Sequence, residues 1–200
     1  MNISFRRLHS EKDLNYFVLK YNESKLEQNL KTMQKDESNL PLDYLQKARV
    51  YGVFKKNEMV AGYVIGFKQP LRLFDFLLPE SRQEVASRYQ SILENCCEVT
   101  CAWRLPHISS VFMSFIFWPH AHFNAIKTGK KFFLGASANH HLDKMYTQAG
   151  PRTLYFGLVN YGLTVRIFFY TRIGLLKYTL RLMLIETPKR WLRKFKKNNL

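Results

Sequence analysis

The sequence predicts one α/β (α+β) domain in which helices flank a sheet, followed by a basic helical tail. Three observations support this fold class. The chain has 200 residues, a length that suits a single hydrophobic core. Residues 49–68 and 153–171 each contain two β-rich runs around a short turn, which predicts two hairpins. Segments with apolar residues at helical spacing lie between the strand-like segments.

The first quarter of the chain predicts a strand, a helix and a hairpin. Residues 3–8, ISFRRL, alternate apolar and basic side chains, as a half-exposed strand does. Ser10 opens the run S-E-K-D, which resembles a capping box and predicts a helix start. Helical spacing continues through residues 11–35, and a polar loop follows. The hairpin of residues 49–68 is expected to turn at residues 55–58.

The middle of the chain predicts two helices separated by a buried strand. Residues 71–78 are apolar, and their pattern assigns no single structure. Residues 79–95 begin with Pro and carry apolar side chains at helical spacing, so we expect one helix there. Residues 96–105 match a buried strand. Residues 109–126 match a very apolar helix, interrupted by Pro119.

The most informative stretch is residues 131–157. A short apolar strand at residues 132–134 leads into a polar turn at residues 135–139. A short helix is expected from about residue 140 to residue 148, with Asn139 as its N-cap and Gly150 as its stop. The next strand then opens the second hairpin.

Tyr146 completes a pattern that resembles a known superfamily. It lies late in the expected helix, on the face shared with Leu142. A strand, an Asn-bearing turn, a helix with a Tyr and a Gly before the next strand resemble the last conserved segment of the GNAT acyltransferases. Within this superfamily, the arrangement is most similar to that of the long-chain N-acyl amino acid and N-acyl homoserine lactone synthases. The resemblance is close in residues 131–157 and elsewhere rests on the order of elements. It implies a central mixed, mostly antiparallel sheet.

The resemblance implies transfer of an acyl group to an amine, with two catalytic candidates. Glu98 lies in the strand that should be central, where it would accept the amine's proton or hold a water that does so. A carboxylate there is costly to bury unless it is paired or its pKa is raised. The alternatives are a place at the strand's solvent end, or a bond to Arg104 or Thr100. Tyr146 would protonate the leaving thiolate, or else be a core aromatic with a backbone partner.

The same segment would hold the pantetheine arm of the acyl donor. The side-chain amide of Asn139 would meet the arm or an ordered water, although a helix cap explains that residue nearly as well. Backbone amides of the preceding turn would complete the contact. The residues assigned to the arm are Ala136, Ser137, Ala138 and Asn139.

The place of the donor's phosphates departs from the superfamily pattern. GNAT enzymes follow the central strand with a basic, Gly-rich loop at a helix start. Residues 104–110 read Arg-Leu-Pro-His-Ile-Ser-Ser and contain no Gly. Arg104 and His107 would lie near a phosphate, and Ser109, followed by Ser110, would cap the helix. The departure suggests either an acyl carrier protein as donor instead of acyl-CoA, or a catalytically dead relative, and the sequence leaves both open.

Residues 111–118, VFMSFIFW, are apolar on every side of the expected helix. Such a helix is buried or faces an apolar partner. Core packing is one interpretation. The other is a slot for a long fatty acyl chain, in which the small Ser114 would leave room for the alkyl group.

The charge is strongly basic, with a formal net charge of +16. Residues 151–200 carry eleven Lys or Arg and one acid, Glu186, so they contribute +10 and the first 150 residues +6. Residues 173–200 therefore suit a helix on an anionic membrane surface, or one that docks an acidic carrier or substrate. Packing of this helix on its own domain is the alternative. The apolar tail and the absence of a recognition motif disfavour nucleic acid.

Cysteine and histidine usage predicts neither a disulfide framework nor a metal site. Three Cys within six residues suit reduced thiols in a cytoplasmic protein, and no signal-like segment or long apolar run is visible. The histidines lack the spacing of zinc sites, so packing or surface roles are expected. These histidines are His120, His122, His140 and His141.

Together these patterns predict a GNAT-type N-acyltransferase, of class EC 2.3.1. Residues 1–172 would form the acyltransferase domain, and residues 173–200 a basic amphipathic helix. The donor would be acyl-CoA or acyl-acyl carrier protein, without a metal, and the acceptor an amine of an amino acid or peptide. The alternative is a non-catalytic GNAT-like module that holds an acidic partner or a membrane. We expect a cytoplasmic protein that associates with the inner face of a membrane.

Overall fold

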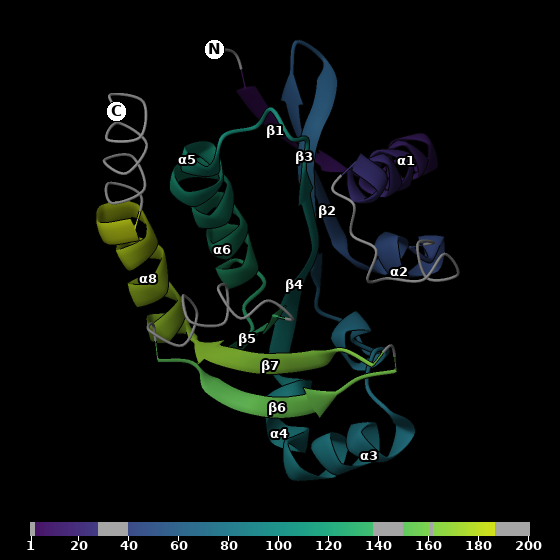
Figure 1. The fold of residues 1–200 in the computed structure, drawn as a ribbon, viewed down its shortest axis with the longest axis vertical. Coiled ribbons are helices and arrows are strands. Elements are labelled where there is room, and N and C mark those ends of the chain that lie inside the picture. Colours follow the sequence, from purple (N-terminus) through teal and green to yellow (C-terminus); the bar gives the residue numbers. More distant parts are fainter. Residues whose placement is uncertain (1–2, 28–39, 138–149, 161, 187–200) are drawn as a thin grey trace.

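A seven-stranded sheet runs through the computed structural model, which describes residues 3–27, 40–137, 150–160 and 162–186 (Figure 1). The strand order is β1-β2-β3-β4-β5-β7-β6, and every neighbouring pair is antiparallel except β4 with β5. This confirms the expected mixed, mostly antiparallel sheet. The strands are β1 (Ile3–Leu8), β2 (Arg49–Lys55), β3 (Glu58–Gly66), β4 (Cys96–Arg104), β5 (Phe132–Ser137), β6 (Arg152–Leu158) and β7 (Thr164–Thr171).

Both expected hairpins form, and so does the first helix. Lys56 and Asn57 join β2 to β3 with positive φ values of 50° and 66°, as a two-residue hairpin turn requires. Ser10 caps α1 (Glu11–Glu27), because its Oγ accepts the backbone N–H of Asp13 at 3.1 Å. The turn at residues 55–58 and the helix start at Ser10 are therefore confirmed.

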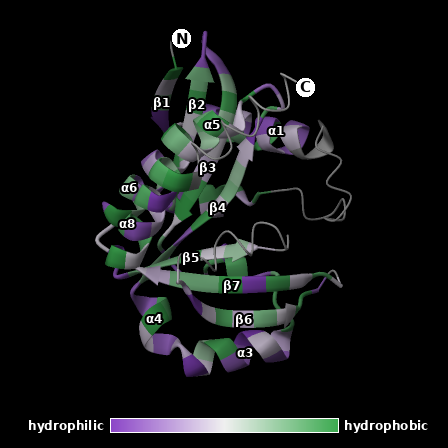
Figure 2. Cartoon of the chain, turned by 60° about the vertical axis from the view of Figure 1, so that its left-hand side comes forward, coloured by the Kyte–Doolittle hydropathy of each residue, from purple (hydrophilic) through white to green (hydrophobic). Residues whose placement is uncertain are grey.

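Helices cover both faces of the sheet. On one face lie α1, the short helix α2 (Leu42–Lys47) and the segment between β3 and β4. On the other face lies a helix built from α5 (Ser110–Phe112), the π-helical turn η3 (Met113–Phe117) and α6 (Trp118–Ile126), beside α8 (Arg172–Arg181). Figure 2 shows apolar colour along the strands and on α5 and α6, where the core lies.

The segment between β3 and β4 corrects the expected single helix over residues 79–95. The chain instead forms the 3-10 turn η2 (Arg72–Phe74), α3 (Pro79–Arg88) and α4 (Gln90–Glu94). The break falls at Tyr89, where φ is −122° and ψ is 22°. Tyr89 packs against a buried cluster beneath β5, β7 and β6, and this tertiary contact overrides the local helical preference.

Two further expectations need correction. Gly135 to Ser137 belong to β5 and not to a turn, because β7 pairs with them as far as Ser137↔Arg166. A long partner strand thus fixes residues whose own β-propensity is low. The α-helix is interrupted just before Pro119 and not at it, because the π-turn ends at Phe117 and Pro119 is the second residue of α6. Proline has no backbone N–H to donate to the preceding turn, and a π-turn there tolerates the missing hydrogen bond.

The described part of the tail packs on the domain. Thr171 caps α8 through its Oγ1, which accepts the N–H of Gly174 at 3.2 Å. Leu175, Tyr178 and Thr179 are buried against α6 and the sheet. The turn η4 (Leu182–Glu186) continues the helix. The expected basic amphipathic helix of residues 173–200 stays a prediction for residues 187–200, which lie outside the described residues. Within the described ranges, no helix has the length and apolar character to span a membrane.

Candidate functional site

The two central strands are joined at one end and apart at the other. β4 and β5 pair in parallel at Cys96↔Phe132, Cys97↔Phe133 and Glu98↔Leu134. Beyond Glu98, residues 99–104 pair with β3 and residues 135–137 pair with β7. We call the space between these two inner edges the wedge. Backbone N–H and C=O groups along such edges need partners, so an extended chain that enters the wedge can hydrogen-bond to them.

A bulge in β4 accounts for this separation. The β3–β4 register shifts between Gly62 and Val64, and Cys101 has a φ of 50°. A bulge bends its strand and increases the twist, and a non-glycine residue at positive φ costs roughly 1–3 kcal/mol. Gly62 makes room for two side chains next to the bulge, because a Cβ there would lie 2.5 Å from the Phe17 ring and 2.9 Å from Trp103 Nε1. The Phe17 side chain of α1 thus packs directly on β3 beside the bulge.

Cavities open on both sides of the wedge. The Tyr21 cavity, of about 250 Å³, lies on the side of α1 and η2. The Trp118 cavity, of about 70 Å³, lies on the side of α6 and α8. Ala136 lines both cavities, so each of them borders β5 at this residue. Other residues around the Tyr21 cavity include Arg72, Thr100, Cys101, Ala102 and Ser137.

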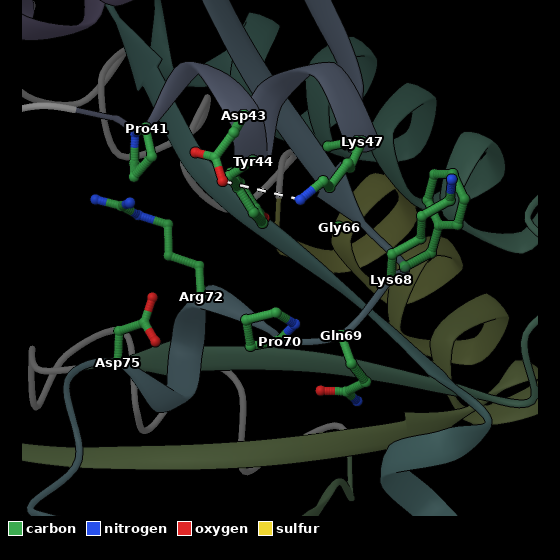
Figure 3. Close-up of a pocket in the computed structure, with 12 residues that line it drawn as sticks. Pro41, Asp43, Tyr44, Lys47, Gly66, Lys68, Gln69, Pro70, Arg72 and Asp75 are labelled. Carbon is green, nitrogen blue, oxygen red and sulfur yellow. Dashed lines mark ion pairs between the residues drawn. The ribbon is translucent and has the colours of Figure 1, made fainter.

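A third cavity, the Tyr44 cavity of about 220 Å³, lies between α2 and residues 66–75 (Figure 3). Its charged side chains are Asp43, Lys47, Lys68, Arg72 and Asp75. Lys47 pairs with Asp43 at 3.9 Å, and both are largely exposed. Arg72 lines this cavity and the Tyr21 cavity alike, so it stands between them.

Glu98 occupies the point at which β4 and β5 separate, and it is fully buried. Its Oε1 accepts the Tyr44 hydroxyl at 2.7 Å and the Arg72 backbone N–H at 2.8 Å. Its Oε2 accepts the N–H of Leu73 at 2.9 Å. The expected alternatives, a solvent-exposed end or a bond to Arg104 or Thr100, are therefore wrong.

The pKa of Glu98 reflects two opposing effects. Burial raises the pKa to about 7, because the ionised carboxylate has lost its water. The three donors favour the ionised form and lower the pKa in part. Both protonation states are thus populated near neutral pH, which suits a group that exchanges a proton.

A cluster of polar groups that the sequence did not indicate surrounds Glu98. Burial raises the pKa of Tyr44, and the neighbouring Glu98 adds to this. Burial also raises the pKa of Tyr21, and the neighbouring Cys101 raises it further. Arg72 lines one cavity with Tyr44 and another with Tyr21, and its charge lowers the pKa of both tyrosines in part. These residues come from α1, α2, η2 and β4, and no sequence spacing relates them.

The loop after β4 is held by its own side chains. The Arg104 guanidinium donates to the carbonyl of Ile108. Ser109 is the helix N-cap, as predicted, because its Oγ accepts the N–H of Phe112 at 3.1 Å. His107 and Ser109 are exposed, and Ser110 is half-buried. The structure therefore gathers the four residues expected near a phosphate at the end of β4.

The residues expected to hold the donor's arm divide into two groups. Ala136 and Ser137 lie on β5 and line the Tyr21 cavity beside the wedge. Ala138, Asn139 and Tyr146 lie outside the described residues, so their roles stay predictions.

Two histidines have packing partners. His120 Nδ1 lies 2.7 Å from the Tyr63 hydroxyl, and His122 Nδ1 lies 2.8 Å from Thr179 Oγ1. Burial lowers the pKa of His122 to about 3, so this ring is neutral at physiological pH. His140 and His141 lie outside the described residues. In the ranges that the structure covers, no three His, Cys, Asp or Glu side chains gather around a metal-sized site.

The three cysteines are free and buried. Burial raises the pKa of Cys96 to about 12 and that of Cys97 to about 11. Both thiols are thus protonated at neutral pH, and a protonated thiol is a poor nucleophile.

Solved structures share this arrangement over most of the chain. FeeM, an N-acyl amino acid synthase from uncultured soil microbes, superposes with a TM-score of 0.67 at 12% identity and covers 92% of this chain and 98% of its own. A putative acetyltransferase of the GNAT family from Desulfovibrio desulfuricans gives a TM-score of 0.58 at 11% identity, over 86% of this chain and 99% of its own. The chain has the GNAT fold.

A third GNAT-fold structure is an enzyme with an amine substrate. The polyamine N-acetyltransferase of Drosophila melanogaster, which catalyses the formation of N-acetylagmatine, gives a TM-score of 0.57 at 8% identity, over 85% of this chain and all of its own. No protein-family model and no curated protein matches the sequence. At such identities the likeness establishes the fold, and the function has to be argued from the site.

Proposed function

We propose that this protein is a GNAT-type N-acyltransferase that moves an acyl group from a thioester donor to the amine of an amino acid or peptide. The wedge between β4 and β5 is the observation that carries the proposal. Its inner edges, residues 99–104 and 135–137, are unpaired with each other, although each is paired on its outer side. A pantetheine arm carries amide groups that fit such edges, and the Tyr21 and Trp118 cavities provide space at either side.

The donor in this proposal is acyl-CoA, with acyl carrier protein as the other candidate. Both carry the same pantetheine arm, so the wedge does not discriminate between them. The phosphate would lie at the loop of Arg104, His107, Ser109 and Ser110, where a helix begins. Ala138 and Asn139 would continue the contacts that Ala136 and Ser137 make with the arm.

The reaction is a direct transfer. The amine nitrogen attacks the thioester carbonyl, a C–N bond forms, and the C–S bond breaks. The amine's proton passes to the Tyr44 oxygen while the Tyr44 hydroxyl proton passes to Glu98, which accepts that hydrogen bond at 2.7 Å. Tyr146 gives its proton to the leaving thiolate and regains one from water, and Glu98 releases its proton back through the Tyr44 hydroxyl. This route is needed because Glu98 itself is fully buried.

The acyl chain in this proposal is long, and it begins in the Trp118 cavity. Apolar side chains from α6, β5, β7 and α8 dominate this cavity. Its volume of about 70 Å³ is small, so a long chain has to continue beyond it. Product yield against acyl chains from two to sixteen carbons measures this preference directly.

The function is tested by mass spectrometry of N-acyl products. The purified protein is incubated with acyl-CoA or acyl-acyl carrier protein and a mixture of the twenty amino acids. Ala136→Trp places an indole on a residue that lines both cavities, and it should weaken acyl-CoA binding at least tenfold in calorimetry. Tyr146→Phe should lower kcat. Absence of both product and donor binding, or full activity of Glu98→Gln and Tyr146→Phe, would favour the non-catalytic module instead.

We also propose that the C-terminal region docks the enzyme on an anionic membrane at the inner face. Apolar side chains on α8 and η4 are exposed, with Ile173 at 67% and Leu184 at 69%. Lys177 and Arg181 lie on the same helix, and residues 187–200 carry further cations. Such a composition suits the interface between headgroups and acyl chains.

A further inference from the structure

Arg72 is a largely buried cation whose guanidinium has no partner among the described residues. The residue is 9% exposed, and its backbone N–H is bound to Glu98. Across the described part of the chain, no hydrogen bond or ion pair involves its guanidinium. No guanidinium nitrogen of Arg72 is among the fully buried, unpaired polar atoms of the described residues, so the group reaches the open space of the Tyr44 cavity, where an anionic ligand can bind it.

The position of Arg72 identifies where that ligand would lie. The side chain extends from η2 into the Tyr44 cavity, toward the space between Pro41 and Asp75 (Figure 3). It also lines the Tyr21 cavity, which includes Thr100 and Ser137 on the two edges of the wedge. A ligand bound to the guanidinium is therefore held next to the place where the thioester arm would enter.

The charges around Arg72 favour a small carboxylate. Lys47 is neutralised in part by Asp43, and Lys68 lies across the cavity. Asp75 and the Glu98 carboxyl disfavour a multiply charged anion such as phosphate at this point. A guanidinium binds a carboxylate through two parallel hydrogen bonds, which fixes the orientation of the bound molecule as well as its position.

We propose that Arg72 binds the α-carboxylate of the acceptor, so that the acceptor is a free amino acid and not a peptide side chain. This inference rests on the proposed function. The carboxylate anchors the molecule at Arg72, and its amine, two bonds away from the carboxyl carbon, is directed toward the thioester. Arg72 is then a substrate-binding residue that determines specificity.

The test takes the amino acids that are acylated fastest and compares each with its own amide. The amide keeps the amine and lacks the negative charge. Wild type should prefer the amino acid over the amide at least tenfold in kcat/KM. Arg72→Met keeps an unbranched apolar stem and should reduce this preference to threefold or less, chiefly through KM. Arg72→Lys should retain part of it. Arg88→Met, an exposed Arg on α3, is the matched control and should behave as wild type.

Direct binding separates the two proposals. Calorimetry is run with the twenty amino acids, inorganic phosphate and a lysine-containing peptide with blocked termini. If no amine is acylated but an amino acid binds wild type and not Arg72→Met, the Arg72 inference holds and the proposed function fails. If acylation occurs with the same amino acid to amide ratio in Arg72→Met as in wild type, the Arg72 inference is overturned and the function stands. Preference for phosphate or the blocked peptide, or no amino acid binding at all, also overturns it.

Discussion

The buried carboxyl of Glu98 should make the stability of this protein depend on pH in a distinctive way. Its pKa is about 7 in the folded protein against an ordinary 4.5. The folded state therefore binds more protons than the unfolded chain between these values, and the free energy of unfolding falls as pH rises. The stabilisation is complete below pH 4.5 and is lost as pH rises through about 7.

The magnitude follows from the two pKa values. Each pKa unit corresponds to about 1.4 kcal/mol, and most of the shift is expressed between pH 5 and pH 8. Glu98 should thus lower the free energy of unfolding by about 2 to 3 kcal/mol over that range. Glu98→Gln removes this titration. It also places an amide N–H₂ opposite the N–H of Leu73, so its stability at any one pH should fall by about 1–3 kcal/mol.

The assay is urea unfolding followed by circular dichroism at pH 5, 6, 7 and 8. The pH-dependent change in wild type should exceed that in Glu98→Gln by about 2 to 3 kcal/mol, since other titrating groups are common to both. Glu94→Gln, an exposed carboxylate on α4, is the control and should leave the pH dependence unchanged. Equal pH dependence in wild type and Glu98→Gln would refute the reasoning about burial.

Three other perturbations test the site and the tail. Tyr44→Phe removes a donor to the ionised carboxylate, so the pKa of Glu98 should rise further and kcat should fall by roughly 10- to 100-fold, measured as a pH–rate profile. Gly66→Ala would place a Cβ 2.5 Å from the Tyr44 hydroxyl and 2.7 Å from Glu98 Oε1, so it should cost about 1–3 kcal/mol in urea unfolding. Gly174→Ala, with its nearest contact at 3.3 Å, is the milder comparison. Deletion of residues 187–200 should reduce binding to vesicles that contain anionic lipid, and unchanged sedimentation with those vesicles would contradict the membrane proposal.

The candidate site was only partly predictable from the sequence. Glu98 was found because a carboxylate in an apolar strand is conspicuous at the level of sequence. Its partners were missed, because Tyr44 is 54 residues away and Arg72 is 26 residues away along the chain. Neither residue belongs to a pattern with regular spacing, so nothing local related them to Glu98.

The sequence by itself determined the order and type of most elements. Alternation, helical spacing and turn residues act between neighbours along the chain, and these patterns placed β1, both hairpins and the strand that carries Glu98. Tertiary contacts decided the rest. β7 drew Gly135 to Ser137 into β5, packing split the helix at Tyr89, and a bulge at Cys101 opened the wedge. Pairing, burial and the convergence of charges on one cavity depend on residues that are distant in the chain, so only the folded protein specifies them.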